Sequence, residues 1–126
     1  MEYHVADIKP VQAPRARWGY VLTSAQNSYV AGRDGSCRFP GCEVLATMRG
    51  KDHIVPYSHK VPTRGGPTDV SNLQSLCRTH HNLETNGTWH ASTDEGSCTI
   101  YWVDRHGDGS TITLHASDQQ KNLKIR

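Results

Sequence analysis

The chain has 126 residues and a mass of 14.0 kDa, which is enough for one domain. Only 35% of its residues are hydrophobic and it has a single Phe, so the apolar core must be small and would gain from a bound metal. Residues 1–5 lack the basic and apolar regions of a signal peptide, and no stretch approaches the roughly 18 apolar residues of a membrane span. We therefore expect a cytoplasmic protein with no membrane partner.

The net charge of +2 is unevenly distributed along the chain. Residues 1–64 hold nine Lys/Arg against five Asp/Glu, whereas residues 65–126 hold five against seven, so the halves carry +4 and −2. A basic half can face the phosphates of a nucleic acid, although ordinary solvated surface charge is the alternative. The candidates for such phosphate contacts are Arg33, Arg38, Arg49 and Lys51.

A short helix is the first element that the sequence predicts. Thr23 or Ser24 can cap its start, and it should run to about Gly32 with Tyr29 and Val30 on its inner face.

Four residues with metal-binding side chains follow. Cys37 and Cys42 flank a Pro-Gly pair, which favours a knuckle that brings both sulfur atoms to one ion. Cys77 and His80, three residues apart, complete the four donors that a closed tetrahedral zinc site needs. Disulfides of a secreted protein are the alternative for the cysteines, and Cys98, alone on a strand-like stretch, should be a free thiol.

The central region predicts a hairpin, a loop and a helix. Residues 44–57 suggest two short strands, the second holding His53, and residues 58–70 form a Pro- and Gly-rich loop. Ser71 then looks like the N-cap of a helix that runs to about Glu84. The residues that would share one face of this helix are Leu73, Leu76, Cys77 and His80.

Three polar residues remain outside the zinc set. His81 is rotated by about 100° from His80 on a helix, so the two histidines cannot serve one ion equally well. Asp52, His53 and His81 are types that bind a catalytic metal and move protons. For phosphodiester hydrolysis, His53 suits the base that activates water because its ordinary pKa is about 6.5. Asp52 and His81 would then supply ligands to a divalent cation.

The C-terminal part predicts a second hairpin. Residues 99–103 and 111–114 alternate like strands around a turn at residues 108–109. Trp89 and Trp102 should pack this hairpin on the helix.

The order of these residues resembles a known family. Asp52-His53, Asn72 and, after eight intervening residues, His81 resemble the signature of the HNH endonucleases of the ββα-metal superfamily. The surrounding stretches 65–69 and 76–81 are similar to the zinc-containing branch common in actinobacteria and their phages. This resemblance implies that His53 is the general base, that Asp52 and His81 hold the catalytic metal, and that Asn72 fixes the loop that aims His53.

The resemblance also implies a fold and an activity. We expect an α+β fold: a small ββα-metal core with a structural zinc knuckle, a preceding short helix and a C-terminal β-hairpin. The domain should span residues 19–115, between flexible ends at 1–18 and 116–126. The implied function is a metal-dependent DNA endonuclease that uses structural Zn²⁺ and a catalytic Mg²⁺, or another divalent cation such as Mn²⁺ or Ni²⁺.

Several alternatives remain open. The chain can instead be a zinc-stapled DNA-binding module with weak or lost cleavage, or the C-terminal nuclease fragment of a longer protein. Asn72 can simply cap its own backbone. His59 and His90 fit no motif and are expected to be surface histidines.

Overall fold

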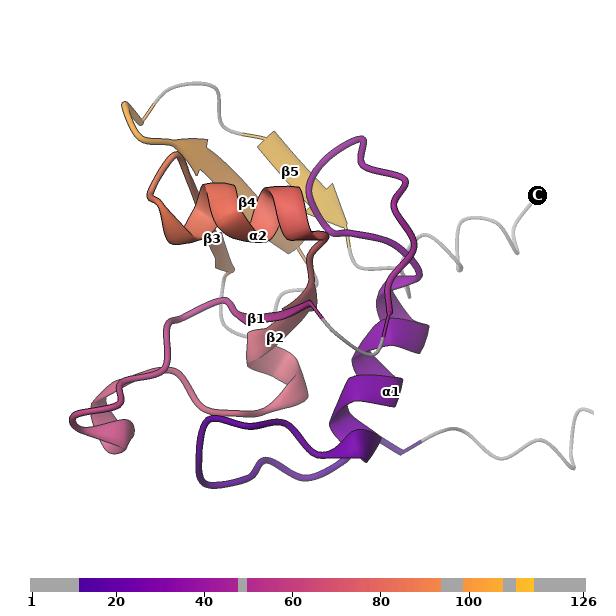
Figure 1. The fold of residues 1–126 in the computed structure, drawn as a ribbon, viewed down its shortest axis with the longest axis vertical. Coiled ribbons are helices and arrows are strands. Elements are labelled where there is room, and N and C mark those ends of the chain that lie inside the picture. Colours follow the sequence, from indigo (N-terminus) through magenta and orange to yellow (C-terminus); the bar gives the residue numbers. More distant parts are fainter. Residues whose placement is uncertain (1–11, 48–49, 94–98, 108–110, 115–126) are drawn as a thin grey trace, which may run out of the picture.

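The computed structural model describes residues 12–47, 50–93, 99–107 and 111–114 (Figure 1). In chain order the elements are α1 (Ser24–Asp34), β1 (Lys51–His53), β2 (Leu73–Ser75), α2 (Arg78–Thr85), β3 (Trp89–Thr93), β4 (Thr99–Asp104) and β5 (Thr111–Leu114), with the 3₁₀ turns η2 (Pro62–Arg64) and η3 (Val70–Asn72) before β2. β1 and β2 form an antiparallel pair, and β3, β4 and β5 form a second antiparallel sheet. α1 packs on β2 and α2 packs on β3. The predicted α+β class, with a β-β-α core, is confirmed.

α1 begins where the sequence predicts because Thr23 and Gln26 form a reciprocal capping box. The Thr23 hydroxyl accepts a hydrogen bond from the Gln26 N–H (3.1 Å), and Gln26 Oε1 accepts one from the Thr23 N–H (3.0 Å). The helix runs two residues further than predicted, to Asp34, and ends at Gly35, whose φ of 71° is unfavourable for other residues. Val30 is fully buried on its inner face, as predicted.

The predicted hairpin within residues 44–57 is wrong. β1 pairs with the distant β2, in a register that places His53 opposite Leu73. The residues before β1 instead close the knuckle, where Leu45 forms an isolated bridge with Ser36. Leu73 is fully buried against α1, and burial of this kind offsets the entropy lost in closing the intervening loop.

The predicted helix start at Ser71 is also wrong. α2 begins at Arg78 with Cys77 as its N-cap, and it ends at Thr85. Asp69, not Ser71, caps the turn η3, because its carboxylate accepts a hydrogen bond from the Ser71 N–H (3.2 Å). All three residues of β2 are buried, whereas a helix at this surface would bury only one face.

The predicted C-terminal hairpin is confirmed by the pairing of β4 with β5. Its predicted turn at residues 108–109 lies outside the described residues. β3 was not predicted and pairs with the other edge of β4. Ile100 and Trp102 of β4 are fully buried. The Phe39 ring makes T-shaped contacts with Trp89 (5.2 Å between centroids) and Trp102 (5.1 Å), so both tryptophans pack this sheet against the knuckle.

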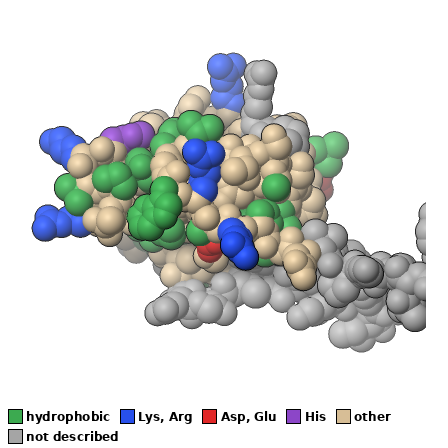
Figure 2. Space-filling view, turned by 90° about the horizontal axis from the view of Figure 1, so that it is seen from below, with side chains coloured by type: hydrophobic (Ala, Val, Ile, Leu, Met, Phe, Trp, Pro, Cys, Tyr) green, Lys and Arg blue, Asp and Glu red, His purple; other side chains and the backbone are tan. Residues whose placement is uncertain are grey.

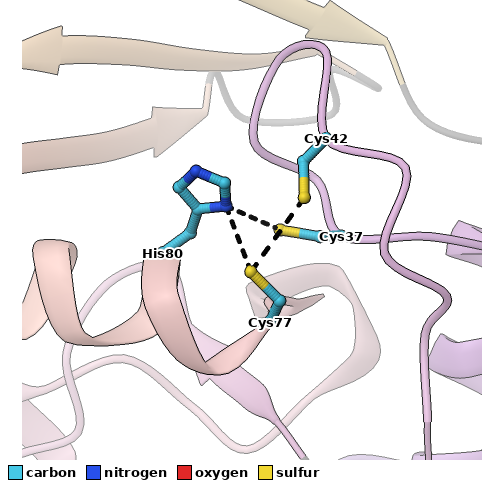
Figure 3. A group of neighbouring side chains, drawn as sticks. All are labelled: Cys37, Cys42, Cys77 and His80. Carbon is cyan, nitrogen blue, oxygen red and sulfur yellow. Dashed lines mark hydrogen bonds between the residues drawn. The ribbon is translucent and has the colours of Figure 1, made fainter.

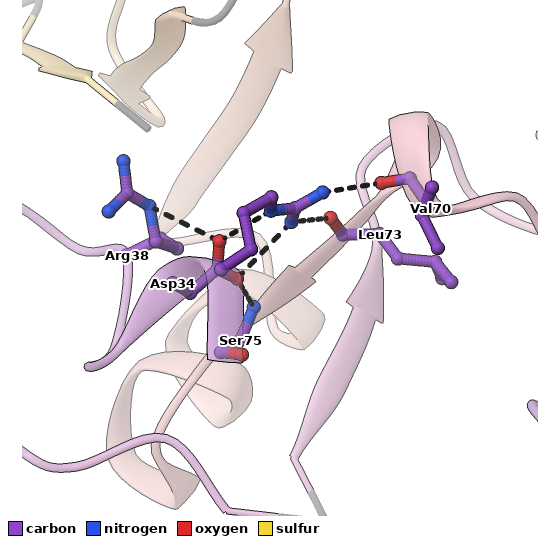
Figure 4. Close-up of polar contacts among 6 residues, drawn as sticks. Asp34, Arg38, Val70, Leu73 and Ser75 are labelled. Carbon is purple, nitrogen blue, oxygen red and sulfur yellow. Dashed lines mark hydrogen bonds and ion pairs between the residues drawn. The ribbon is translucent and has the colours of Figure 1, made fainter. Parts of the chain in front are cut away.

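A buried ion-pair network ties the end of α1 to β2 (Figure 4). Asp34 pairs with Arg33 Nε (2.8 Å) and accepts a hydrogen bond from the Ser75 N–H (2.8 Å), while Arg38 Nε lies 4.0 Å from the same carboxylate. The Arg33 guanidinium also donates to carbonyls of η3 and β2. The side chains of Arg33 and Arg38 are only 10% and 2% exposed, so the prediction that they contact phosphates is wrong.

The apolar core is as small as the composition predicts and divides into two clusters. Cys37, Ile54, Leu76, Ile100 and Trp102 form one, and Val30, Val70 and Leu73 form the other. Among the described residues, no helix combines the length and apolar character that crossing a bilayer requires.

Candidate functional site

Three thiols and one imidazole meet between the knuckle and the start of α2 (Figure 3). His80 Nδ1 lies 3.5 Å from Cys37 Sγ and 3.2 Å from Cys77 Sγ, and Cys42 Sγ lies 4.0 Å from Cys77 Sγ. Two sulfur ligands held about 2.3 Å from one ion in tetrahedral geometry would lie about 3.8 Å apart. The four donor atoms all lie within 4.8 Å of one another, so they could hold one metal ion.

Local sequence explains why the knuckle closes. Gly41 adopts a φ of 78°, and the Cys42 N–H donates to the Phe39 carbonyl (3.0 Å), which completes the reversal between the two cysteines. The Phe39 ring stacks on the His80 imidazole with centroids 4.1 Å apart and planes 6° from parallel. The knuckle therefore orients one of its partner ligands as well as supplying two of its own.

The protonation states of these side chains suit a bound cation. Burial raises the pKa of the Cys37 thiol to about 12, so a nearby positive charge is needed to hold it as a thiolate. Burial would also raise the pKa of Cys77, but the His80 N–H and hydrogen bonds from the other two thiols outweigh it and lower that pKa. Burial lowers the pKa of His80, which favours the neutral imidazole that binds metals.

The disulfide alternative has no support in the described residues. Cys37, Cys42 and Cys77 are all free thiols, and they converge on a histidine that a disulfide would not require. Cys98 lies outside the described residues.

A second group of polar residues lines a pocket of about 400 Å³ between β1 and α2. β1 supplies Asp52 and His53, and α2 supplies His81 and Glu84. His80 points to the thiols while the next residue, His81, reaches this pocket, as the helical rotation between them predicts. The structure therefore brings together the three residues that the sequence leaves outside the zinc set.

Glu84 is a member of this pocket that the sequence analysis missed. Burial, followed by the hydrogen bond and negative charge of Asp52, raises the pKa of Glu84 to about 9. Its Oε2 is buried and has no hydrogen-bond partner among the described residues, and Asp52 Oδ2 accepts a hydrogen bond from Gln74 (3.0 Å). Two carboxyl groups in contact favour a shared proton or a cation. The sequence did offer one signal for Glu84. It lies three residues after His81, a spacing that places both side chains on one face of a helix.

His53 is 7% exposed and is held through one of its ring nitrogens. Nε2 lies 2.8 Å from Thr68 Oγ1, and that hydroxyl donates a hydrogen bond to the Gly19 carbonyl (2.6 Å). Because the hydroxyl proton is already used, Oγ1 can only accept from Nε2–H, which leaves Nδ1 as the unprotonated nitrogen. Burial lowers the pKa of His53 from its ordinary value of 6.5. The negative charge of Asp52 raises this pKa, and the nearby His59 lowers it further.

Asn72 braces the chain that follows His53. Its Oδ1 accepts from the Val55 N–H (2.9 Å), and its Nδ2 donates to the carbonyls of Val55 (3.0 Å) and Pro67 (3.0 Å). These bonds reach across the loop, so the alternative in which Asn72 only caps its own backbone does not describe its contacts. A Cβ at Gly66 would collide with the Val55 carbonyl oxygen and with Asn72 Nδ2, so only glycine fits this close approach.

Four further residues were singled out from the sequence. Lys51 lines the pocket, and burial lowers its pKa. Arg49 lies outside the described residues. His59 and His90 are exposed, as predicted.

One segment of the chain matches a known family. Residues 37–87 match the family model described as HNH endonuclease. The chain is 39% identical over 87 residues to the uncharacterized protein Rv3776 of Mycobacterium tuberculosis, a match that covers 69% of this chain and 15% of the relative. The uncharacterized proteins Rv2100 and MT2160 of the same species are 38% identical over 87 residues, which is 14% of each. The matched part thus spans about one seventh of the length of these relatives, and no solved structure matches the chain.

Proposed function

We propose that this chain, whose residues 37–87 match the HNH endonuclease family model, is a metal-dependent endonuclease that hydrolyses DNA phosphodiester bonds. The observation that carries the proposal is the pocket between β1 and α2, where a buried histidine lies beside two carboxylates and a second histidine. We place the domain within residues 19–115, with residues 15–18 lying along it because the Arg17 N–H donates to the Thr68 carbonyl (3.0 Å).

His53 acts as the general base in this proposal. Its Nε2–H is held by Thr68, so Nδ1 is free to take a proton from the water that attacks phosphorus. Its depressed pKa keeps the imidazole neutral at pH 7, the form that a base requires. Asn72 supports this geometry by bracing the segment that follows His53.

Asp52 and His81 hold the catalytic cation, with Glu84 as a third ligand. The mixed oxygen and nitrogen donors suit Mg²⁺, Mn²⁺ or Ni²⁺, and the buried Glu84 Oε2 without a partner fits an oxygen ligand. A cation bound there supplies charge stabilisation to the phosphate and to the departing 3′ oxygen. The Cys37, Cys42, Cys77 and His80 group holds a separate structural Zn²⁺.

The proposal is tested by incubating the purified protein with supercoiled plasmid and Mg²⁺, Mn²⁺, Ni²⁺ or EDTA. Nicked or linear plasmid that forms only with a divalent cation supports the endonuclease. Plasmid that is bound and stays supercoiled with every cation would instead favour the zinc-stapled DNA-binding module.

Thr68→Val is expected to slow cleavage by about 10- to 100-fold, the usual effect of losing a group that orients a reactive one. Valine keeps the shape of the side chain but cannot accept the Nε2–H bond, so His53 loses its fixed tautomer. Thr68→Ser should restore most of the rate because it restores the hydroxyl. Single-turnover cleavage rates measure this effect, with the exposed Thr79→Val as a control. A Thr68→Val protein that folds and cuts at the wild-type rate would contradict this role.

Glu84→Gln is expected to raise the Mn²⁺ concentration for half-maximal cleavage at least about tenfold. Glutamine keeps the size of the side chain but cannot release a proton to become the anionic oxygen ligand that Glu84 becomes when the cation binds. Without added cation the melting temperature should stay close to that of wild type, because the raised pKa already keeps Glu84 neutral beside Asp52 at pH 7. Titration of cleavage with Mn²⁺ measures the shift, and the exposed Glu43→Gln is the matched control. Superimposable titrations of Glu84→Gln and wild type would rule out Glu84 as a ligand.

A further inference from the structure

Aromatic side chains that the proposed chemistry does not use lie in and beside the pocket. Trp18 is 83% exposed and Tyr20 is 51% exposed, whereas aromatic rings of this size are usually well buried. Tyr57 and His59 lie beside Tyr20, with ring centroids 5.5 and 4.8 Å from it. We call these four residues the aromatic rim.

The aromatic rim connects the pocket to a second cavity. Tyr20 stacks on His53 with centroids 5.3 Å apart and planes 14° from parallel, so one face of its ring covers the proposed base. Tyr20 and Tyr57 both line the 400 Å³ pocket. Tyr57 also lines a neighbouring cavity of about 430 Å³, whose other walls include Trp18 and the Gly65-to-Thr68 stretch. A chain of aromatic surfaces therefore leads from the proposed base outward to Trp18.

The rim is anchored to the domain and is not a loose arm. The carbonyl of Gly19, which lies between Trp18 and Tyr20, accepts a hydrogen bond from the Thr68 hydroxyl (2.6 Å). Gln26 Nε2 donates to the carbonyls of Arg15 (3.2 Å) and Thr68 (2.9 Å). The same hydroxyl that holds His53 thus holds the rim in place beside it.

Positive charge flanks the rim. In Figure 2, Lys and Arg side chains stand among hydrophobic ones on the face formed by the segment before α1 and the loop after β1. The exposed basic residues of these two segments are Arg15, Arg17, Lys60 and Arg64. In residues 12–23 and 55–69 the single acidic residue is Asp69, whose carboxylate is already bonded to Ser71. The surface therefore attracts a polyanion that also carries flat apolar groups.

We propose that the aromatic rim binds unpaired DNA next to the scissile phosphate, with nucleobases stacking on Trp18 and the outer face of Tyr20. Exposed aromatic rings interleaved with basic side chains are the combination that binds single strands, because every base offers a face and every phosphate a charge. In a duplex the bases are already stacked on one another and cannot lie on these rings. This inference rests on the proposed nuclease function and specifies its substrate: single-stranded DNA, or duplexes with unpaired stretches.

The test compares binding by fluorescence anisotropy without added divalent cation, so that no DNA is cut. Three labelled probes of one sequence are used: a single strand, its blunt duplex, and that duplex with an unpaired bubble. Wild type should bind the single strand and the bubble about tenfold more tightly than the duplex. Trp18→Ala should lose roughly tenfold or more in affinity for the single strand, within the range of one base-stacking contact. Duplex affinity should change little.

Two matched variants separate stacking from folding. Trp18→Phe retains an aromatic face and should keep most of the single-strand preference. Leu45→Ala removes a side chain of similar exposure (76%) from the knuckle and should bind as wild type does. Equal wild-type affinity for single strand and duplex, or a Trp18→Ala protein with unchanged binding, would overturn the inference. So would a wild-type dimer that Trp18→Ala converts to monomer, because the rim would then be covered by a second copy.

Cleavage keeps this inference separate from the proposed function. Plasmid cleavage with duplex-preferring binding would leave the endonuclease standing and refute the rim. Single-strand binding without cleavage of the plasmid, the single strand or the bubble under any cation would support the rim as a binding surface and refute the nuclease.

Discussion

His53→Ala is expected to lower DNA cleavage at least about 100-fold, the typical contribution of a positioned general base. The variant loses the only imidazole that the structure anchors through Thr68 inside the pocket, among the residues it describes. Zinc content and far-UV circular dichroism should match wild type, because His53 lies outside the Cys3His group. The matched control is His90→Ala, which removes an exposed histidine from β3.

Metal and pH dependence distinguish a base from a ligand. His81→Ala should also lose cleavage, but excess Mn²⁺ should partly restore it, whereas His53→Ala should stay inactive at every Mn²⁺ concentration.

Because burial lowers the pKa of His53 from 6.5, the wild-type rate should fall with decreasing pH only below 6.5 and be level above it. Equal cleavage by wild type and His53→Ala would contradict the assigned mechanism and favour the DNA-binding module.

Loss of the structural metal is expected to unfold the protein. Zinc binding contributes about 10–16 kcal/mol in small zinc domains, comparable to or larger than the roughly 5–15 kcal/mol by which whole domains are stable. Here the ligands join the knuckle to α2, and Cys37 belongs to the larger of the two small apolar clusters. Cys77→Ala, or a strong chelator applied to wild type, should therefore abolish the cooperative thermal transition seen by circular dichroism.

Elemental analysis should find about one zinc per chain in wild type and in His81→Ala, and far less in Cys77→Ala. His81→Ala is the matched control because it alters α2 next to His80 of the Cys3His group without touching the thiols. A wild-type protein that is well folded and contains no zinc would refute this site.

Local sequence signals correctly predicted the helix and strands that form through interactions between residues close together in the chain. The capping box of Thr23 and Gln26 determines where α1 begins, and the alternation of β4 and β5 is visible without tertiary information. The β1–β2 pair was missed because its strands have three residues each and lie on either side of a long loop. In the sequence, Leu73 and Gln74 follow the apparent helix cap Ser71 and so fit a helix. In the structure they are completely buried and pair with β1 as a strand.

Residue type and spacing alone predicted the Cys3His group that the structure brings together. Thiols and an imidazole at Cys37, Cys42, Cys77 and His80 select a soft-metal site, and the step from His80 to His81 on one helix separates the two groups. These relations hold within single turns, where backbone geometry fixes the distance between side chains.

Only the tertiary structure decided which distant side chains share a pocket or lose their contact with water. It placed Thr68 between His53 and Gly19, put Glu84 against Asp52, and buried Arg33. Each of these contacts closes a loop of the chain, and the entropic cost of closing a loop depends only weakly on its length. Separation in sequence therefore does not select which side chains meet. Burial and the need to satisfy hydrogen bonds in the folded chain select them instead.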